Sequence, residues 1–327
     1  MSKFAKGVVF ALAGAACWGF SGTCAQYLGM RCTISPVFIV MVRNVGAAVV
    51  FGVLLAVRYR AQTREMLSDR SCWGAFFAFA VVGVCTCQTC YIFTINMTNA
   101  GTATVLQSLN VVMVLLWMCV KCRRGPRLFE CAGVCLALVS TFLIATGGDP
   151  ASMNIPVEGL VGGLVTAAAV AVYVLAPRPL FERWDSLPVV AAGMVVAGAF
   201  SGVVWCAGAL LCAGAPALAP VFSVPALGAD GAAALAAMLL VGTIVAFALY
   251  LYGVAIVGGV TGSLLGTMEP VTASVLAAAW LGTSFSLADW AGLVLMMAMI
   301  FLVALQPSES PSARKLARRT RRGKRRE

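Results

Sequence analysis

Two charged side chains lie inside long apolar runs of this sequence. Charged groups at such positions are the first candidates for a functional role. Glu269 lies near the middle of the run Gly259 to Gly282, and Arg43 lies about eight residues into the run 36–57. An acidic residue at a membrane centre costs about 2.5 to 3.5 kcal/mol. Ionisable groups at that depth therefore usually face a cavity or a partner. We expect both residues to take part in binding or coupling.

Glu269 has two possible roles, and the sequence leaves both open. Desolvation favours the neutral form of a carboxylic acid, so Glu269 could take up a proton and exchange it for a substrate. Alternatively, its carboxylate could accept hydrogen bonds beside Pro270, whose missing N–H disturbs the helical hydrogen bonding. The first role predicts proton-coupled transport, and the second predicts a structural carboxylate.

Arg43 also allows two interpretations. At a rise of about 1.5 Å per residue, it lies roughly 5 Å from the predicted midplane, toward the outer side. It could bind a substrate carboxylate or pair with Glu269. Alternatively, its long side chain could reach the outer membrane interface or cap helix carbonyls.

Several uncharged residues lie at a useful depth in the apolar runs. Gln107 and Asn110 are three positions apart and therefore share one helix face. The other candidates for substrate binding or coupling are Ser21, Gln88, Thr267, Trp18, Tyr91 and Tyr250. Each could equally serve interhelical hydrogen bonding or packing.

The chain is far more apolar than a soluble domain. Of its 327 residues, 61% are hydrophobic and 11% are charged, whereas soluble domains are about half apolar and about one quarter charged. The apolar residues form runs of about 20, the length of a helix that crosses a bilayer. We predict an all-α integral membrane protein with ten transmembrane helices, at about 7–29, 36–57, 73–96, 99–120, 128–147, 158–177, 187–212, 232–256, 259–282 and 287–306.

The Lys and Arg residues indicate which loops face the cytoplasm. With both termini inside, 21 of the 23 basic residues fall in cytoplasmic segments, as the positive-inside rule requires. Arg31 falls outside and Arg43 lies within a helix. We therefore predict a multi-pass protein of the cell membrane with both termini cytoplasmic.

An internal repeat divides the chain into two halves. A shift of 159 residues pairs Gly83 with Gly242 and Tyr91 with Tyr250, and a shift of 152 pairs the residues before them. Each half then contains five helices, and because five is odd the halves must insert with opposite orientations. Inverted repeats of this kind are a transporter architecture with a binding site near the midplane.

The repeat also sets the predicted domain boundaries. The first repeat spans 1–147, the second spans 158–306, and a basic cytoplasmic tail, predicted to be disordered, occupies 307–327. Under the same shift Asn110 stands opposite Glu269, so each half offers one polar group at an equivalent depth.

The sequence resembles the EamA family of the drug/metabolite transporter superfamily. The matching residues are Trp18-Gly19 in the first helix, Arg43 in the second, and Glu269-Pro270-Val271 followed by Leu281-Gly282 in the ninth. Thr283 stands where the family pattern usually has Glu. The stretch Trp18 to Tyr27 is similar to members grouped as carboxylate, amino-acid or amine transporters.

This resemblance implies a secondary active transporter of small metabolites, expected to be an exporter that uses alternating access. The chain contains no GxxxxGK[ST] loop, so ATP is not expected to drive it. The alternatives are a membrane-embedded enzyme and a passive channel or non-transporting sensor. An enzyme is not expected, because the chain has no histidine and its apolar runs offer no paired acids.

The thirteen cysteines and the basic tail are the remaining candidates for metal or partner binding. Cys119-x-x-Cys122 and Cys131-x3-Cys135 could hold zinc, but small buried hydrophobic residues are the favoured interpretation, so no metal or cofactor is expected. The nine bases of the tail could contact anionic lipid headgroups. The expected partners are a small-molecule metabolite and the lipid bilayer, with a homodimer left open and no nucleic acid.

Overall fold

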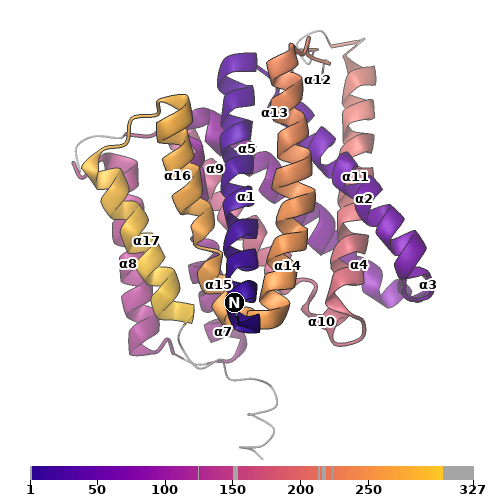
Figure 1. The fold of residues 1–327 in the computed structure, drawn as a ribbon, viewed down its shortest axis with the longest axis horizontal. Coiled ribbons are helices and arrows are strands. Elements are labelled where there is room, and N and C mark those ends of the chain that lie inside the picture. The colour runs from indigo at the N-terminus through magenta and orange to yellow at the C-terminus, as the bar shows by residue number, and fades with distance from the viewer. Residues whose placement is uncertain are drawn as a thin grey trace, which may run out of the picture.

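The computed structural model describes residues 2–123, 125–149, 154–212, 214–215, 219–222 and 224–304 (Figure 1). Every regular element in these ranges is a helix. In the first half these are α1 (Lys3–Cys32), α2 (Pro36–Arg58), α3 (Arg60–Ser68), η1 (Arg70–Cys72), α4 (Trp73–Phe77), η2 (Ala78–Cys85), α5 (Thr86–Met97), α6 (Ala100–Gln107), α7 (Asn110–Lys121) and α8 (Leu128–Thr146).

The second half follows the same plan. Its elements are α9 (Val157–Leu175), α10 (Arg178–Phe181), α11 (Ser186–Leu211), α12 (Ala219–Phe222), α13 (Ala229–Leu239), η4 (Leu240–Val245), α14 (Ala246–Val257), α15 (Gly259–Leu265), α16 (Met268–Leu281) and α17 (Leu287–Ala304). The predicted all-helical membrane class is confirmed.

Within the described ranges, eight helical stretches are long and apolar enough to cross a membrane. Two further apolar helices, Met268–Leu281 and Leu287–Leu302, are shorter. The first of these is short because the predicted ninth run is interrupted after Leu265 and starts again at Met268. The predicted count of ten crossing helices therefore stays a prediction.

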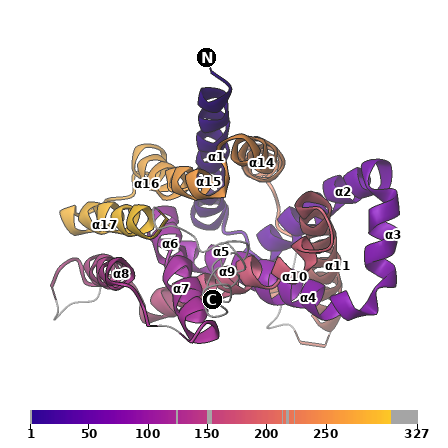
Figure 2. The same cartoon turned by 90° about the horizontal axis from the view of Figure 1, so that it is seen from below.

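Each long helix finds a main neighbour in the opposite half of the chain. Helix α1 packs against α14 and α16, α2 against α11, and α5 against α9. Likewise α6 packs against α16, and α8 against α17 (Figure 2). Neither half therefore forms a closed core by itself, and the interior of the molecule lies between the two repeats.

Equivalent helices of the two halves run in opposite directions. The shift of 159 maps the first residue of α8, Leu128, onto the first residue of α17, Leu287. Yet a Cβ on Gly148, just after α8, would lie 3.9 Å from Ala288 at the start of α17. The two helices are therefore antiparallel, as the predicted inversion of the halves requires.

Two close helix contacts, one in each half, are related to each other by the two sequence shifts. Gly83 of η2 lies against the backbone of Tyr173, and Gly242 of η4 lies against Ser21. Gly83 and Gly242 are related by 159 residues, and Ser21 and Tyr173 by 152. A Cβ at either glycine would overlap its neighbour, so the repeat preserves two points of close helix approach.

The starts of α8 and α17 are capped in equivalent ways. A carboxylate oxygen of Glu130 accepts from the N–H of Arg127 at 2.6 Å, and one of Asp289 accepts from the N–H of Ser286 at 2.8 Å. Each acid thereby satisfies an N–H group that a helix start leaves without a partner. The shift of 159 maps Glu130 onto Asp289, so these two equivalent acids both have a structural role.

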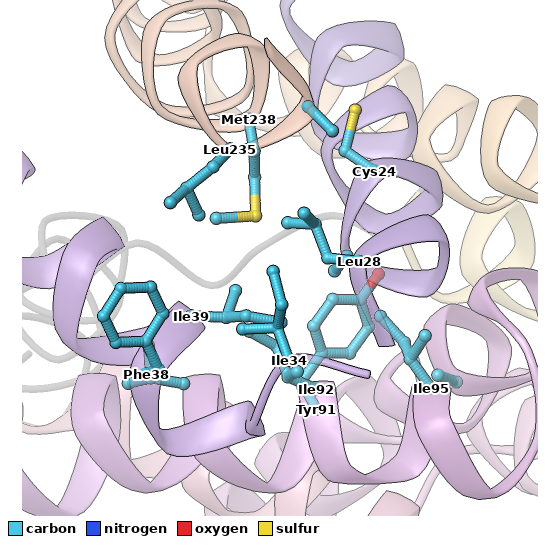
Figure 3. Packing of buried hydrophobic residues seen from close by; sticks show 14 of the residues in the cluster. Cys24, Leu28, Ile34, Phe38, Ile39, Tyr91, Ile92, Ile95, Leu235 and Met238 are labelled. Carbon is cyan, nitrogen blue, oxygen red and sulfur yellow. The ribbon is translucent and has the colours of Figure 1, made fainter. Parts of the chain in front are cut away.

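One hydrophobic core lies between α1, α2, α5 and α13 (Figure 3). Leu28, Ile39, Ile92 and Met238 are fully buried in it. Burying such a side chain contributes about 1.5 to 3 kcal/mol relative to water. This core fixes α1 against both halves, since α13 belongs to the second repeat.

The basic loops gather at one end of the molecule. The start of α1, helix α3, the α7–α8 connection and α10 all lie at the lower end in Figure 1, where α17 also ends. There Arg183 forms an ion pair with Asp69 at 2.7 Å, and hydrogen bonds from Ser71 hold the pKa of Asp69 below its usual value. The basic tail 307–327 lies outside the described residues.

Candidate functional site

Two helices are interrupted at equivalent positions, one in each half. Helix α6 ends at Gln107 and α7 begins at Asn110, while α15 ends at Leu265 and α16 begins at Met268. At both breaks the backbone tightens: Ser108 N–H bonds to the Val105 carbonyl at 3.0 Å, and Thr267 N–H bonds to the Leu264 carbonyl at 3.2 Å. Such breaks expose helix ends inside a bundle, which is how many transporters build midplane sites.

A second pair of irregularities accompanies the breaks. The segments η2 and η4 are both π-helical, and the shift of 159 maps Val84 of η2 onto Thr243 of η4. In each region a threonine hydroxyl bonds to the carbonyl five residues earlier, Thr86 to Val81 at 3.2 Å and Thr243 to Met238 at 3.4 Å. π-helical turns are rare and occur frequently at functional sites.

Glu269 lies where the interrupted helices meet. It occupies the first turn of α16, where the helix dipole favours a carboxylate by about 0.3 to 1 kcal/mol. Gln107, the last residue of α6, donates from Nε2 to its Oε1 at 3.5 Å. This bond is at the long limit for a hydrogen bond, so the partly buried carboxyl keeps acceptor capacity for a proton or a ligand.

Gly19 explains how α1 reaches this point. A Cβ on Gly19 would lie 2.5 Å from the carbonyl oxygen of Glu269 and 2.8 Å from the nitrogen of Ala273. Only a glycine lets the two backbones approach so closely. The preceding residue, Trp18, contacts Tyr250 with ring centroids 4.7 Å apart, and the Tyr250 hydroxyl donates to the Gly262 carbonyl at 3.0 Å.

Arg43 lies inside the molecule. Its side chain is 8% exposed, and its Nε donates to the Thr243 hydroxyl of η4 at 3.3 Å. Its guanidinium lies within electrostatic range of Glu269, Tyr91 and Cys87, but in the described part of the chain no ion pair joins it to Glu269. The interpretation that Arg43 reaches the outer interface is wrong, because its burial and its contact hold it between α2 and η4.

Two further candidates, Tyr91 and Ser21, lie in contacts with other helices. The Tyr91 hydroxyl bonds with Thr104 at 2.9 Å beneath Gly22. Ser21 is buried against Gly242, and its hydroxyl has no hydrogen-bond partner within the described part of the chain.

Three candidates make no described contact with Glu269. Asn110 donates to the Gln107 carbonyl at 2.8 Å and Thr267 to the Leu264 carbonyl at 2.7 Å, so each completes its own helix break. Gln88 is partly buried and makes no hydrogen bond to a described residue. The structure thus brings Glu269 and Gln107 together, with Arg43 and Tyr250 within electrostatic range, and the functional roles stay predictions.

Sequence reasoning missed the residues that hold these groups in place. Thr243 lies 200 residues from Arg43 in the chain. Gln26 of α1 is also buried, and it joins the start of α6 to Thr283 after α16. A signal existed for Gln26, which is an amide inside the apolar first run.

An open groove of about 600 Å³ lies at the end of the molecule that carries the basic loops. Its lining includes Gln62, Glu65, Arg183 and Asp185. None of the predicted site residues lines it. The candidate site is defined instead by the side-chain contacts around Glu269.

The four cysteines considered for zinc are arranged unevenly. Cys119 is buried in α7, whereas Cys131 and Cys135 are exposed on α8. Among the described residues, no group of three or more His, Cys, Asp or Glu side chains could hold a metal ion.

The comparison with protein families decides the identity. The model of the EamA-like transporter family matches residues 5–146 and again residues 157–305. The chain belongs to the EamA-like transporter family. This EamA protein is therefore a membrane transporter, and its family points away from an enzyme.

Known relatives agree with this assignment. The chain is 32% identical over 309 residues to an uncharacterized inner membrane transporter, YicL, of Salmonella typhimurium strain LT2, covering 93% of this chain and 97% of the relative. A crystal structure described only as that of a protein superposes with a TM-score of 0.58 at 15% identity, covering 92% of this chain and 97% of the other. The EamA protein is a multi-pass protein of the plasma membrane.

Proposed function

We propose that this EamA protein is a secondary active exporter of small metabolites, coupled to protons through Glu269. The observation that carries the proposal is the contact between Gln107 and Glu269 at 3.5 Å. It joins two interrupted helices, one from each half, at their broken ends. A site in this place can be exposed to either side when the halves rock against each other.

The site offers complementary groups for a small polar metabolite. Glu269 can exchange a proton or accept from a substrate amine, and the Arg43 guanidinium can bind a substrate carboxylate. Only the Nε of Arg43 has a hydrogen-bond partner among the described residues, so its terminal nitrogens remain available. Trp18 and Tyr250 supply apolar surface beside them. Amino acids, carboxylates and amines are the substrate classes that this chemistry fits.

We propose the following arrangement in the membrane. Ten crossing segments form two inverted repeats, 1–147 and 158–306, with the basic loops and both termini in the cytoplasm. The clustering of basic loops at one end supports this orientation.

Reconstitution into proteoliposomes tests the proposal. Radiolabelled amino acids, carboxylates and amines are offered with and without a pH gradient. Saturable flux that responds to the gradient is expected for wild type. In Glu269→Gln the response to the gradient is expected to disappear, because an amide cannot exchange a proton. Glu158→Gln, at an exposed acid in the first turn of α9, is the matched control and should behave as wild type.

Each alternative gives a different result in the same assay. Undiminished gradient-driven flux in Glu269→Gln contradicts proton coupling through this residue. Flux that does not saturate indicates a channel, chemical conversion without flux indicates an enzyme, and the absence of both indicates a sensor. Reversing the gradient and the substrate side distinguishes export from import.

A further inference from the structure

Gln26 bridges three helices at the end of the molecule opposite the start of α1. Its side-chain Oε1 accepts from the backbone N–H of Ala100 at 2.9 Å. Its Nε2 donates to the Thr283 hydroxyl at 2.9 Å and lies 3.4 Å from the Met30 sulfur. Gln26 is 1% exposed. The bond to Ala100 is buried, and the bond to Thr283 is partly buried.

The two bonded groups are ends of the half-helices that carry the candidate site. Ala100 is the first residue of α6, whose last residue is Gln107. Thr283 follows Gly282, the left-handed residue that closes α16, whose first turn contains Glu269. Helices α6 and α16 therefore touch at the site through Gln107 and Glu269. They are joined again through Gln26, at a point about 10 Å from Gln107 along α6 and about 20 Å from Glu269 along α16.

Helix α1 contacts α16 through further residues besides the side-chain amide of Gln26. The Trp280 ring of α16 stacks on both Phe20 and Tyr27 of α1, with centroids 6.2 and 5.5 Å away. Gly19 adds direct backbone contact with α16. Gln26 therefore belongs to the α1–α16 unit, and the bond to Thr283 orients its amide so that Oε1 faces Ala100.

We propose that Gln26 is a positioning residue that latches α6 to the α1–α16 unit and keeps the molecule closed at the end opposite the start of α1. The inference rests on the proposed function, because opening that end is one half of alternating access. The bond that must break is Ala100 N–H to Gln26 Oε1. It is a neutral hydrogen bond of modest net strength, so the latch can be released in a transport cycle.

A thiol reporter at the α6–α16 contact tests the latch. Ser274 is 3% exposed and faces Gly101 of α6, so the thiol introduced by Ser274→Cys is shielded while this end stays closed. Labelling by N-ethylmaleimide is followed in nanodiscs and resolved by peptide mass spectrometry. Native Cys72, 5% exposed near the opposite end, reports on general loosening of the fold.

In the Ser274→Cys background, Gln26→Leu is expected to raise the labelling rate at position 274 roughly tenfold, as loss of a net hydrogen bond predicts. Thr283→Val, which removes only the orienting contact, should raise it less. Thr23→Val is the matched control, because Thr23 is equally buried on α1 but bonds only to the Gly19 carbonyl of its own helix. It should leave both thiols unchanged.

Two results would overturn the inference. One is unchanged labelling at position 274 in Gln26→Leu. The other is an equal rise at position 274 and Cys72, which would mean that Gln26 merely stabilises the fold. If Gln26→Leu does not accumulate, Thr283→Val alone carries the test with the same two readings. The assay needs no transported substrate, so a failed latch and a failed transport proposal are distinguishable.

Discussion

At the scale of single residues, Glu269 is set apart by what surrounds it. One weak hydrogen bond from Gln107, the start of α16 and the close backbone of Gly19 define its position. Among the described residues Arg43 is hydrogen-bonded through Nε, and its guanidinium lies within electrostatic range of Glu269. A carboxyl group held this loosely can change its partners, which a purely structural carboxylate does not need to do.

The Gly19 contact gives a sharp prediction. Gly19→Ala places a Cβ 2.5 Å from the Glu269 carbonyl oxygen, so α1 and α16 must separate. Overpacking of this kind costs about 1 to 3 kcal/mol. Unfolding in mixed detergent micelles should show the loss. Gly74→Ala, where a Cβ meets nothing within 4 Å, is the control, and equal stability of the two variants would contradict the prediction.

At the scale of elements, α2 reaches both π-helical segments through two adjacent residues. Arg43 donates to Thr243 of η4. Asn44 donates to Ser201 of α11 at 2.9 Å, and Ser201 lies 3.5 Å from the Cys85 sulfur of η2. The two π-helical segments, one in each half, are therefore both linked to α2. A movement of α2 can thus move both segments together.

Removing the hydroxyl of Thr243 tests this tie. Thr243→Val leaves the buried Arg43 Nε without its acceptor, and an unsatisfied buried donor costs about 1 to 3 kcal/mol. The free energy of unfolding should fall by this amount relative to Thr23→Val. In a double-mutant cycle with Arg43→Met, the two losses should not add. Additive losses would show that the contact contributes nothing.

The sequence predicted some elements well and others poorly, for physical reasons. Long apolar runs and a lone acid are visible because each is costly or favourable by itself in a bilayer. The interruption at Ser108 has no sequence signal, because small residues are common inside membrane helices. The one at Gly266 has a signal in Pro270, which cannot donate to the Gly266 carbonyl, but a proline alone does not show that the helix stops, so both helices are predicted as continuous. Thr243 was missed as the partner of Arg43 because only the folded chain brings them together.

At the scale of the whole molecule, the two halves depend on each other. Helices α1, α2, α5, α6 and α8 all take main neighbours from the second half. The stability of either half by itself should therefore be low.

Dividing the chain tests this dependence. Residues 1–153 expressed alone should be degraded or aggregate, since the faces of α1 and α5 that meet α14 and α9 would lack partners. Coexpression with 154–327 should restore a complex that purifies intact and labels at Cys72 as slowly as the full chain. A stable, monodisperse first half on its own would contradict the prediction, as measured by size-exclusion chromatography.

The pairing of helices across the halves also governs how the chain is made. Ribosomes add roughly 5 to 20 residues per second, so about 150 residues of the second half emerge roughly 8 to 30 seconds after the first half has entered the membrane. During that interval α1 must wait for α14, with its glycine-lined face turned to lipid or to an insertion factor. Biogenesis of this transporter is thus expected to include a period in which the membrane helices of its first half are inserted but unassembled.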